Sequence, residues 1–210
     1  DVWRSSNTSF YDIDAFDRGG SGVYQIETRI YTGPNNTGTL VENWSVQVST
    51  SNVNSYTNNW KISDTTFNNL KEGYNYVSVR AKDKALNTSE VLQDAFYIKK
   101  DTTPASIPTL ISPSNQSSTN TLSVNFAWSN SNDLASGVKG YEIYISTDEN
   151  FSVIISSFVN ATNRTITLPK ENIYYWKVRS IDNADNYSNF SSTYSVIIDT
   201  TLPQIIDNQS

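Results

Sequence analysis

The sequence contains an internal repeat, and this constrains the fold most strongly because both copies must share one architecture. Three motifs occur twice in the same order: SGV at 21–23 and 136–138, VRAKDKALNTS at 79–89 and VRSIDNADNYS at 178–188, and DTT at 101–103 and 199–201. The long motif is identical at six of eleven positions, at an offset of 99 residues. We therefore expect two tandem domains, 1–101 and 102–201, followed by a tail, 202–210.

Apolar residues alternate with polar ones along both copies, which places each apolar set on the buried face of a β-strand. In the second copy the sets are Leu122/Val124/Phe126/Trp128, Tyr141/Ile143/Ile145, Ile166/Leu168, Tyr174/Trp176/Val178 and Tyr194/Val196/Ile198. In the first copy they are Tyr24/Ile26/Ile30, Trp44/Val46/Val48, Trp60/Ile62, Val77/Val79 and Phe96/Ile98. The pattern predicts an all-β fold of two antiparallel β-sandwiches. Extra residues at 33–38 and 51–59 predict a longer middle hairpin in the first copy.

The second copy resembles a fibronectin type III domain, a member of the immunoglobulin-like sandwiches. Residues 122–128 (LSVNFAW) resemble the second strand of that family with its core Trp128, and residues 140–145 (GYEIYI) resemble the third strand. The spacing from Leu168 to Tyr174 resembles the tyrosine corner. In the first copy Asp12 and Asn75 stand where these aromatic residues would align. The DTTP junction and the DxAxN hairpins resemble tandem arrays of microbial cell-surface or secreted proteins.

Composition excludes several classes of function. The chain has no Cys, His or Met, which removes disulfides, Cys/His zinc sites and Ser-His-Asp catalysis. Its 15 basic and 21 acidic side chains give a net charge of −6 without a basic cluster, so we expect no nucleic-acid partner. No apolar run is long enough for membrane insertion. Because initiator Met and leader are both missing, we expect a mature or excised fragment. We predict no enzyme activity, no catalytic residue and no cofactor other than calcium.

Four carboxylates are candidate calcium ligands. In an antiparallel sandwich the first strand begins at the same pole as the second-to-third and sixth-to-seventh loops, so Asp101 should approach Asp133, Asp182 and Asp185. Hard oxygen ligands of this kind suit Ca²⁺. The alternative is that they are solvated turn carboxylates, and the spacing matches no EF-hand. The first copy has a second acidic cluster, at Asp12, Asp14 and Asp17.

The two DxAxN elements are predicted to be structural hairpin turns. Asp83 and Asp182 would accept hydrogen bonds from nearby backbone N–H groups, while Asn87 and Asn186 would tolerate the left-handed conformation. No partner acid or apolar pocket is evident for catalysis by these carboxylates.

Eleven Asn-x-Ser/Thr sequons mark candidate glycosylation sites, although a chain so rich in Asn, Ser and Thr produces many by chance. They are Asn7, Asn35, Asn43, Asn87, Asn115, Asn150, Asn160, Asn163, Asn186, Asn189 and Asn208.

A polar and aromatic stripe is predicted on the outer face of one sheet in each copy. It consists of Tyr76, Ser78 and Arg80 in the first copy and Tyr175, Lys177 and Arg179 in the second. Such a stripe can stack sugars or bind a protein partner, or it can consist of cross-strand pairs on a solvated face.

The tail resembles the first strand of a further domain. Residues 203–210 (PQIIDNQS) repeat residues 108–117 (PTLISPSNQS) with two residues fewer, and residues 1–10 contain no comparable segment. Head-to-tail strand donation between chains would explain this, and so would a fragment cut from a longer array.

These patterns together predict a non-catalytic, extracellular structural module: a spacer, stalk or fibre subunit of a surface or secreted protein. Its partners would be neighbouring copies or domains of the same protein. The alternative is an adhesion or carbohydrate-binding module with a glycan or host-surface ligand.

Overall fold

The computed structural model describes residues 2–206, and the chain divides into two compact units, Asp1–Thr103 and Pro104–Ser210. The division falls two residues beyond the expected boundary. Residues 202–206 form no strand, so the strand-like tail predicted there is not seen as a strand, and residues 207–210 of that tail lie outside the described part. None of the described helices has the length and apolar character needed to cross a membrane.

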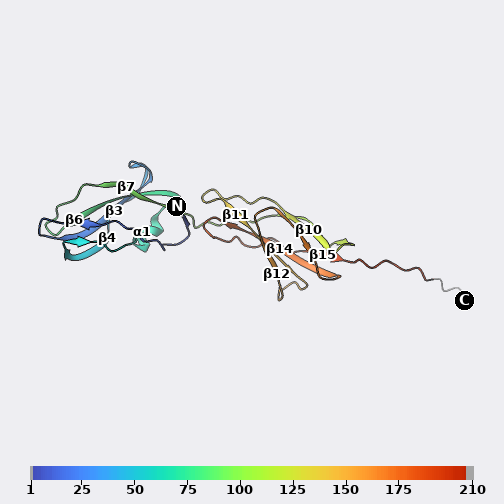
Figure 1. The fold of residues 1–210 in the computed structure, drawn as a ribbon. Helices are drawn as coiled ribbons and strands as arrows, with labels where there is room; N and C mark the ends of the chain where they lie inside the picture. Colours follow the sequence, from blue (N-terminus) through green and yellow to red (C-terminus); the bar gives the residue numbers. More distant parts are fainter. Residues whose placement is uncertain (1, 207–210) are drawn as a thin grey trace. The chain divides into compact units, whose positions relative to one another are not determined.

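The second unit is a β-sandwich of a three-stranded sheet, in the order β13-β10-β8, and a five-stranded sheet, β12-β11-β14-β15-β9 (Figure 1). Its strands are β8 (Leu110–Ser112), β9 (Ser117–Thr119), β10 (Ser123–Trp128), β11 (Val138–Ser146), β12 (Ile155–Val159), β13 (Asn163–Thr167), β14 (Asn172–Asp182) and β15 (Tyr194–Ile198). Phe126 and Trp128 of one sheet pack with Ile143, Trp176 and Val196 of the other. This core consists of the alternating positions that the sequence predicts to be buried.

The first unit has a five-stranded sheet, in the order β1-β7-β6-β3-β4, and a two-stranded one, β2-β5 (Figure 1). Its elements are β1 (Trp3–Arg4), β2 (Ala15–Phe16), β3 (Val23–Gly33), β4 (Thr37–Val53), β5 (Ser55–Tyr56), α1 (Asp64–Asn69), β6 (Gly73–Asp83) and β7 (Leu92–Lys100). Strands β3 and β4 form a long hairpin around the turn at 34–36. Ile26, Ile30, Val77 and Ile98 are buried in a separate core of this unit.

Two details of the first unit differ from expectation. Trp60 and Ile62 are buried, but they belong to no strand in the described part of the chain; Trp60 forms an isolated bridge with Tyr11. The segment leads into the unpredicted helix α1, which begins because the Ser63 hydroxyl accepts a hydrogen bond from the Thr66 N–H (3.0 Å).

Val46 is 43% exposed, so its expected burial is wrong. The pairing of β4 with β3 shifts register at several points, including one between Ile26 and Glu27. Each shift turns the following residues relative to the sheet, so strict alternation no longer predicts which side chain faces the core.

The tyrosine corner that the sequence of the second copy predicts is present in the structure. Tyr174 is 1% exposed, and its hydroxyl donates a hydrogen bond to the carbonyl oxygen of Lys170 at 2.9 Å. This bond ties the segment before β14 to the strand, as the family pattern implies.

Candidate functional site

Two aspartates of the second unit hold loops by hydrogen bonds: Asp133 holds the loop before strand β11, and Asp182 holds the loop after β14. Asp133 accepts hydrogen bonds from the backbone N–H groups of Ala135 (3.1 Å) and Gly137 (2.7 Å). Asp182 ends β14 and accepts from the N–H groups of Ala184 and Asn186, both at 2.8 Å. Each carboxylate therefore fixes its own loop, as the turn interpretation predicts.

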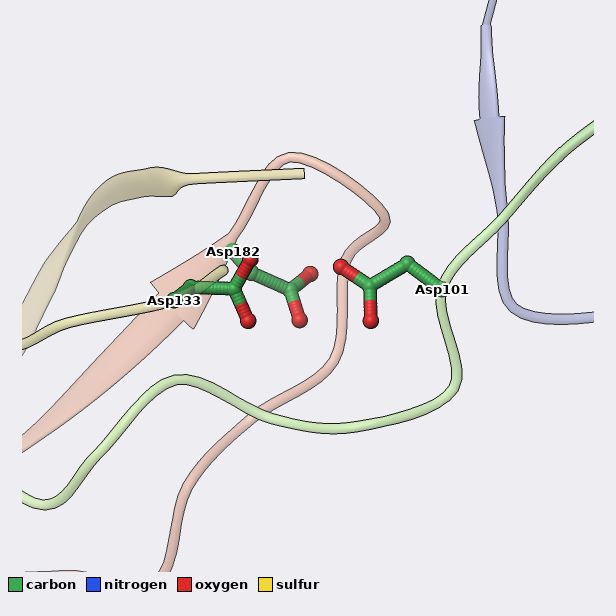
Figure 2. A group of neighbouring side chains, drawn as sticks. All are labelled: Asp101, Asp133 and Asp182. Atoms are coloured by element: carbon green, nitrogen blue, oxygen red, sulfur yellow. The ribbon is translucent and has the colours of Figure 1, made fainter. Parts of the chain in front are cut away.

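Asp133 and Asp182 belong to a group of three carboxylates with the linker residue Asp101 (Figure 2). One oxygen from each of the three lies within 4.8 Å of the others. Oxygen donors of this type are what Ca²⁺ takes from a protein, and three carboxylates would supply part of its six to eight ligands. Calcium binding by these carboxylates stays a prediction.

The fourth predicted ligand, Asp185, is not in this group. Its carboxylate forms an ion pair with Lys139 Nζ at 2.5 Å and is 68% exposed. Hydrogen bonding to Asp185 and its negative charge raise the pKa of Lys139. In the first unit, Asp12, Asp14 and Asp17 form no comparable group among the residues that the structure describes.

The two DxAxN hairpins have the same hydrogen bonds in both units, which confirms that they are structural turns. Asn87 donates its backbone N–H and its side-chain amide to Asp83, both at 2.8 Å, and Asn186 does the same to Asp182. The expected left-handed residue is wrong, however. Positive φ occurs one residue earlier, at Leu86 (69°) and Asp185 (63°), because the Asn carbonyl must turn back to accept from the Asp N–H.

The two arginines of the outer-face stripes form ion pairs with glutamates on neighbouring strands. Arg80 Nε donates to Glu27 Oε2 at 2.7 Å and its guanidinium lies 4.1 Å from the centroid of Trp44. Arg179 pairs with Glu142 at 2.6 Å. Ser78 is not on an open surface as expected: it is 1% exposed and accepts from the N–H of Asp94.

Lys177 and Tyr175 complete the second stripe. Lys177 Nζ lies over the rings of Phe151 (3.9 Å) and Phe190 (4.7 Å). Burial and the nearby negative charge of Glu149 raise the pKa of Tyr175.

All the described sequon residues are exposed or half-buried. Three of them use their side-chain Nδ2, the atom that a glycan would modify, as a donor within the protein: Asn7 to Ile62 and Asp64, Asn87 to Asp83, and Asn186 to Asp182. Asn208 lies outside the described residues. Glycosylation of the remaining sites stays a prediction.

Four glutamates that the sequence analysis did not identify form equivalent contacts in the two units. Glu72 accepts from the N–H and hydroxyl of Thr102, and Glu171 accepts from the same groups of Thr200. Glu27 and Glu142 pair with the equivalent Arg80 and Arg179. The sequence could have indicated the first pair, because Glu72 and Glu171 are separated by 99 residues, the offset that relates the two DxAxN hairpins.

Comparisons with known proteins give structural neighbours only. No family model matches the sequence, and no curated protein matches it. The chain is similar to the FN1–FN3 domains of chicken CNTN1, with a TM-score of 0.43 and 14% identity over 93% of this chain and 67% of that one. It is also similar to the fibronectin(III)-like modules of Clostridium thermocellum CbhA (0.42, 13% identity, 99% and 94% covered) and to an Fn3-like protein from Clostridium thermocellum (0.35, 20% identity, 50% and 100% covered). The structural neighbours of this chain are thus fibronectin type III domains.

Proposed function

We propose that this chain is a non-catalytic structural module of an extracellular protein, acting as a spacer, stalk or fibre unit. The observation that carries the proposal is that both units fix the segment after their last strand in the same way. Thr103 donates its N–H to Asp101 Oδ1 (3.1 Å) and Thr201 donates to Asp199 Oδ1 (3.0 Å), beside the Glu72 and Glu171 contacts. Because the segment that follows the last strand is fixed by the same hydrogen bonds in both units, the arrangement suits modules connected in series.

The pairing of the charged groups supports a non-catalytic role. Glu27 and Glu142 are paired with arginines, and Asp83 and Asp182 are occupied by their own hairpins. A general acid or base instead needs a carboxylate that faces a site where substrate can bind. The absence of thiols and imidazoles also leaves a surface that suits oxidising surroundings.

Immunogold electron microscopy of the source cells and their secreted material tests the proposal. Label on the cell surface, or on secreted rods or fibres, is the expected result. Label confined to the cytoplasm contradicts it. A screen of the purified chain against hydrolase substrates should show no turnover above the buffer rate.

One observation favours the alternative of a recognition module. Trp3, Tyr74, Tyr76 and Tyr97 form a cluster of rings on the five-stranded sheet of the first unit, with centroids 5.5–6.2 Å apart in the contacting pairs. Tyr74 is 42% and Tyr97 38% exposed, so part of each ring is accessible to a sugar, although Lys99 Nζ lies 5.2 and 5.7 Å from their centroids. The control is Phe10→Ala, which changes a 65% exposed ring outside the cluster. A glycan-array signal that the double variant Tyr74→Ala/Tyr97→Ala loses, and that the control keeps, would support recognition over the spacer role.

A further inference from the structure

Strand β12 forms one edge of the five-stranded sheet of the second unit (Figure 1). In the described part of the chain it pairs with β11 alone, so alternate residues of β12 direct their N–H and C=O groups away from the sheet. The pairing with β11 has no register shift, so this edge is regular over its whole length. A regular edge of this kind can accept another strand.

The segment around β12 lacks the features that protect a sheet edge from other strands. Residues 151–163 (FSVIISSFVNATN) contain no charged residue and no proline. Within the strand, Ile155 is 39% exposed and Phe158 is 53% exposed. An exposed edge that is apolar, uncharged and free of bulges favours association with another strand.

The other edges of the described sheets are protected. Val23 of β3 and Val138 of β11 stand at equivalent positions of the repeat, so their outer neighbours, β4 and β12, are equivalent edges. Strand β4, however, carries the charged Glu42, and its pairing with β3 shifts register at several points. In the second unit β8 and β9 have only three residues each, and β13 carries the exposed Arg164. Short strands, charges and bulges all discourage edge-to-edge pairing.

The side chains of β12 complement a second copy of the same strand. Two antiparallel β12 strands overlap over all five residues when Ser157 stands opposite Ser157 of the second copy. Ile155 then lies opposite Val159 of the second copy, and both belong to the face that pairs with the core residues of β11. On the other face the large Phe158 lies opposite the small Ser156, so no two large side chains compete for the same space.

The charges at the two ends of the segment favour the same arrangement. Glu149 precedes the uncharged segment and Arg164 follows it, and both side chains are exposed. Antiparallel pairing brings the acidic end of each segment toward the basic end of the other copy, whereas parallel pairing would bring like charges together. Because the segment itself is uncharged, the strands meet without local repulsion even though the chain has a net charge of −6.

We propose that β12 pairs antiparallel with β12 of a second copy of this chain, so that the two five-stranded sheets become one continuous sheet. The contact is two-fold symmetric, both copies use the same edge, and the assembly closes at a dimer. A contact made by one short strand is small, so dimerisation in solution requires a high protein concentration. This inference goes beyond the spacer role and does not depend on it, because the exposed edge is a property of the second unit alone.

Sedimentation equilibrium of the full chain over a wide concentration range tests the proposal. The mass of the wild type should rise to twice the monomer mass and go no further. Ser156→Lys and Ser156→Glu should each stay monomeric over that range, because each variant places two like charges diagonally across the contact. Their equimolar mixture should dimerise again, since the diagonal charges are then opposite. Ser118→Lys, which changes an exposed serine of the edge strand β9, is the matched control and should dimerise like wild type.

A single cysteine identifies the contact, because the chain has no cysteine of its own. Residues directly opposite in an antiparallel pair have Cα atoms about 4.5–5.5 Å apart, which a disulfide can span. Under mild oxidation Ser157→Cys should therefore form a disulfide-linked dimer faster than Ser118→Cys.

Four results would overturn the proposal: a wild type that stays monomeric or grows beyond a dimer, a Ser156→Lys variant that dimerises like wild type, a mixture of the two Ser156 variants that stays monomeric, or equal crosslinking of the two cysteine variants. Each would leave the spacer role unaffected, because immunogold localisation tests that role separately.

Discussion

Asn75 forms two hydrogen bonds with the backbone of Lys71: its Oδ1 accepts from the Lys71 N–H at 3.0 Å, and its Nδ2 donates to the Lys71 carbonyl at 2.7 Å. Asn75 is fully buried and stands where Tyr174 stands in the second unit. There the tyrosine hydroxyl reaches the carbonyl of Lys170, the residue equivalent to Lys71. The two units therefore close the same corner with different side chains.

This relationship predicts that removing the side-chain contact at this corner lowers the free energy of unfolding by a different amount in each unit. Asn75→Ala should destabilise the first unit by about 2–3 kcal/mol, because it leaves two backbone groups near the core without partners. Tyr174→Phe should cost the second unit about 1 kcal/mol, since one hydrogen bond is lost and the ring remains. Hydrogen exchange followed by mass spectrometry resolves the units, because peptides of each report its own opening. Asn58→Ala, an exposed asparagine, is the control, and equal effects of all three changes would contradict the prediction.

Glu27 makes the stability of the first unit depend on pH. Burial alone would raise the pKa of Glu27, but hydrogen bonds from Lys82 and Arg80, together with their charges, lower it below its ordinary value of 4.5. The folded state therefore binds the proton less readily than the unfolded one. This contribution to stability is present above about pH 4.5 and is lost as the pH falls through the lowered pKa.

Glu27→Gln should remove that dependence. At pH 7 the variant should be less stable than wild type by about 1.5–3 kcal/mol, since charged hydrogen bonds are replaced by weaker ones. The difference should shrink as the pH approaches 3. Urea unfolding of both proteins across this range, with Glu90→Gln as the exposed control, is the measurement. A difference that stays constant with pH would mean that the Glu27 charge is not responsible.

The repeat and the alternation of apolar residues were enough to predict the sandwich of the second unit, because β10 with β13, and β11 with β14 from Gly140 onward, pair without a register shift. They were insufficient for the first unit, where bulges rotate Val46 outward and Trp60 reaches the core from an irregular segment. The convergence of Asp133 and Asp182 followed from strand order alone. The ion pair of Asp185 with Lys139 could not be predicted from strand order, because it depends on the direction in which one exposed side chain points.

The three carboxylates of Figure 2 predict a response to calcium. If Ca²⁺ binds there, a concentration of about 100 times Kd should stabilise the protein by about 2.7 kcal/mol relative to chelator. Asp101→Asn should abolish the response, because it removes a charge while keeping an oxygen that can accept from Thr103. Asp185→Asn should leave the response intact. Melting curves that coincide in excess calcium and in chelator would leave only the turn interpretation.

The left-handed residues of the hairpins predict a stabilising substitution. Leu86 has a φ of 69° and is 69% exposed, so its side chain contributes little packing and its backbone is strained. Leu86→Gly should stabilise the first unit by about 0.5–1 kcal/mol, because relief of the left-handed strain outweighs the extra chain entropy of glycine. Ala85→Gly, one residue earlier and with φ in the ordinary region, should instead destabilise it, since only the entropy term applies. Hydrogen exchange of the 79–89 hairpin would separate the two effects, and destabilisation by both glycines would show that the positive φ of Leu86 carries no strain.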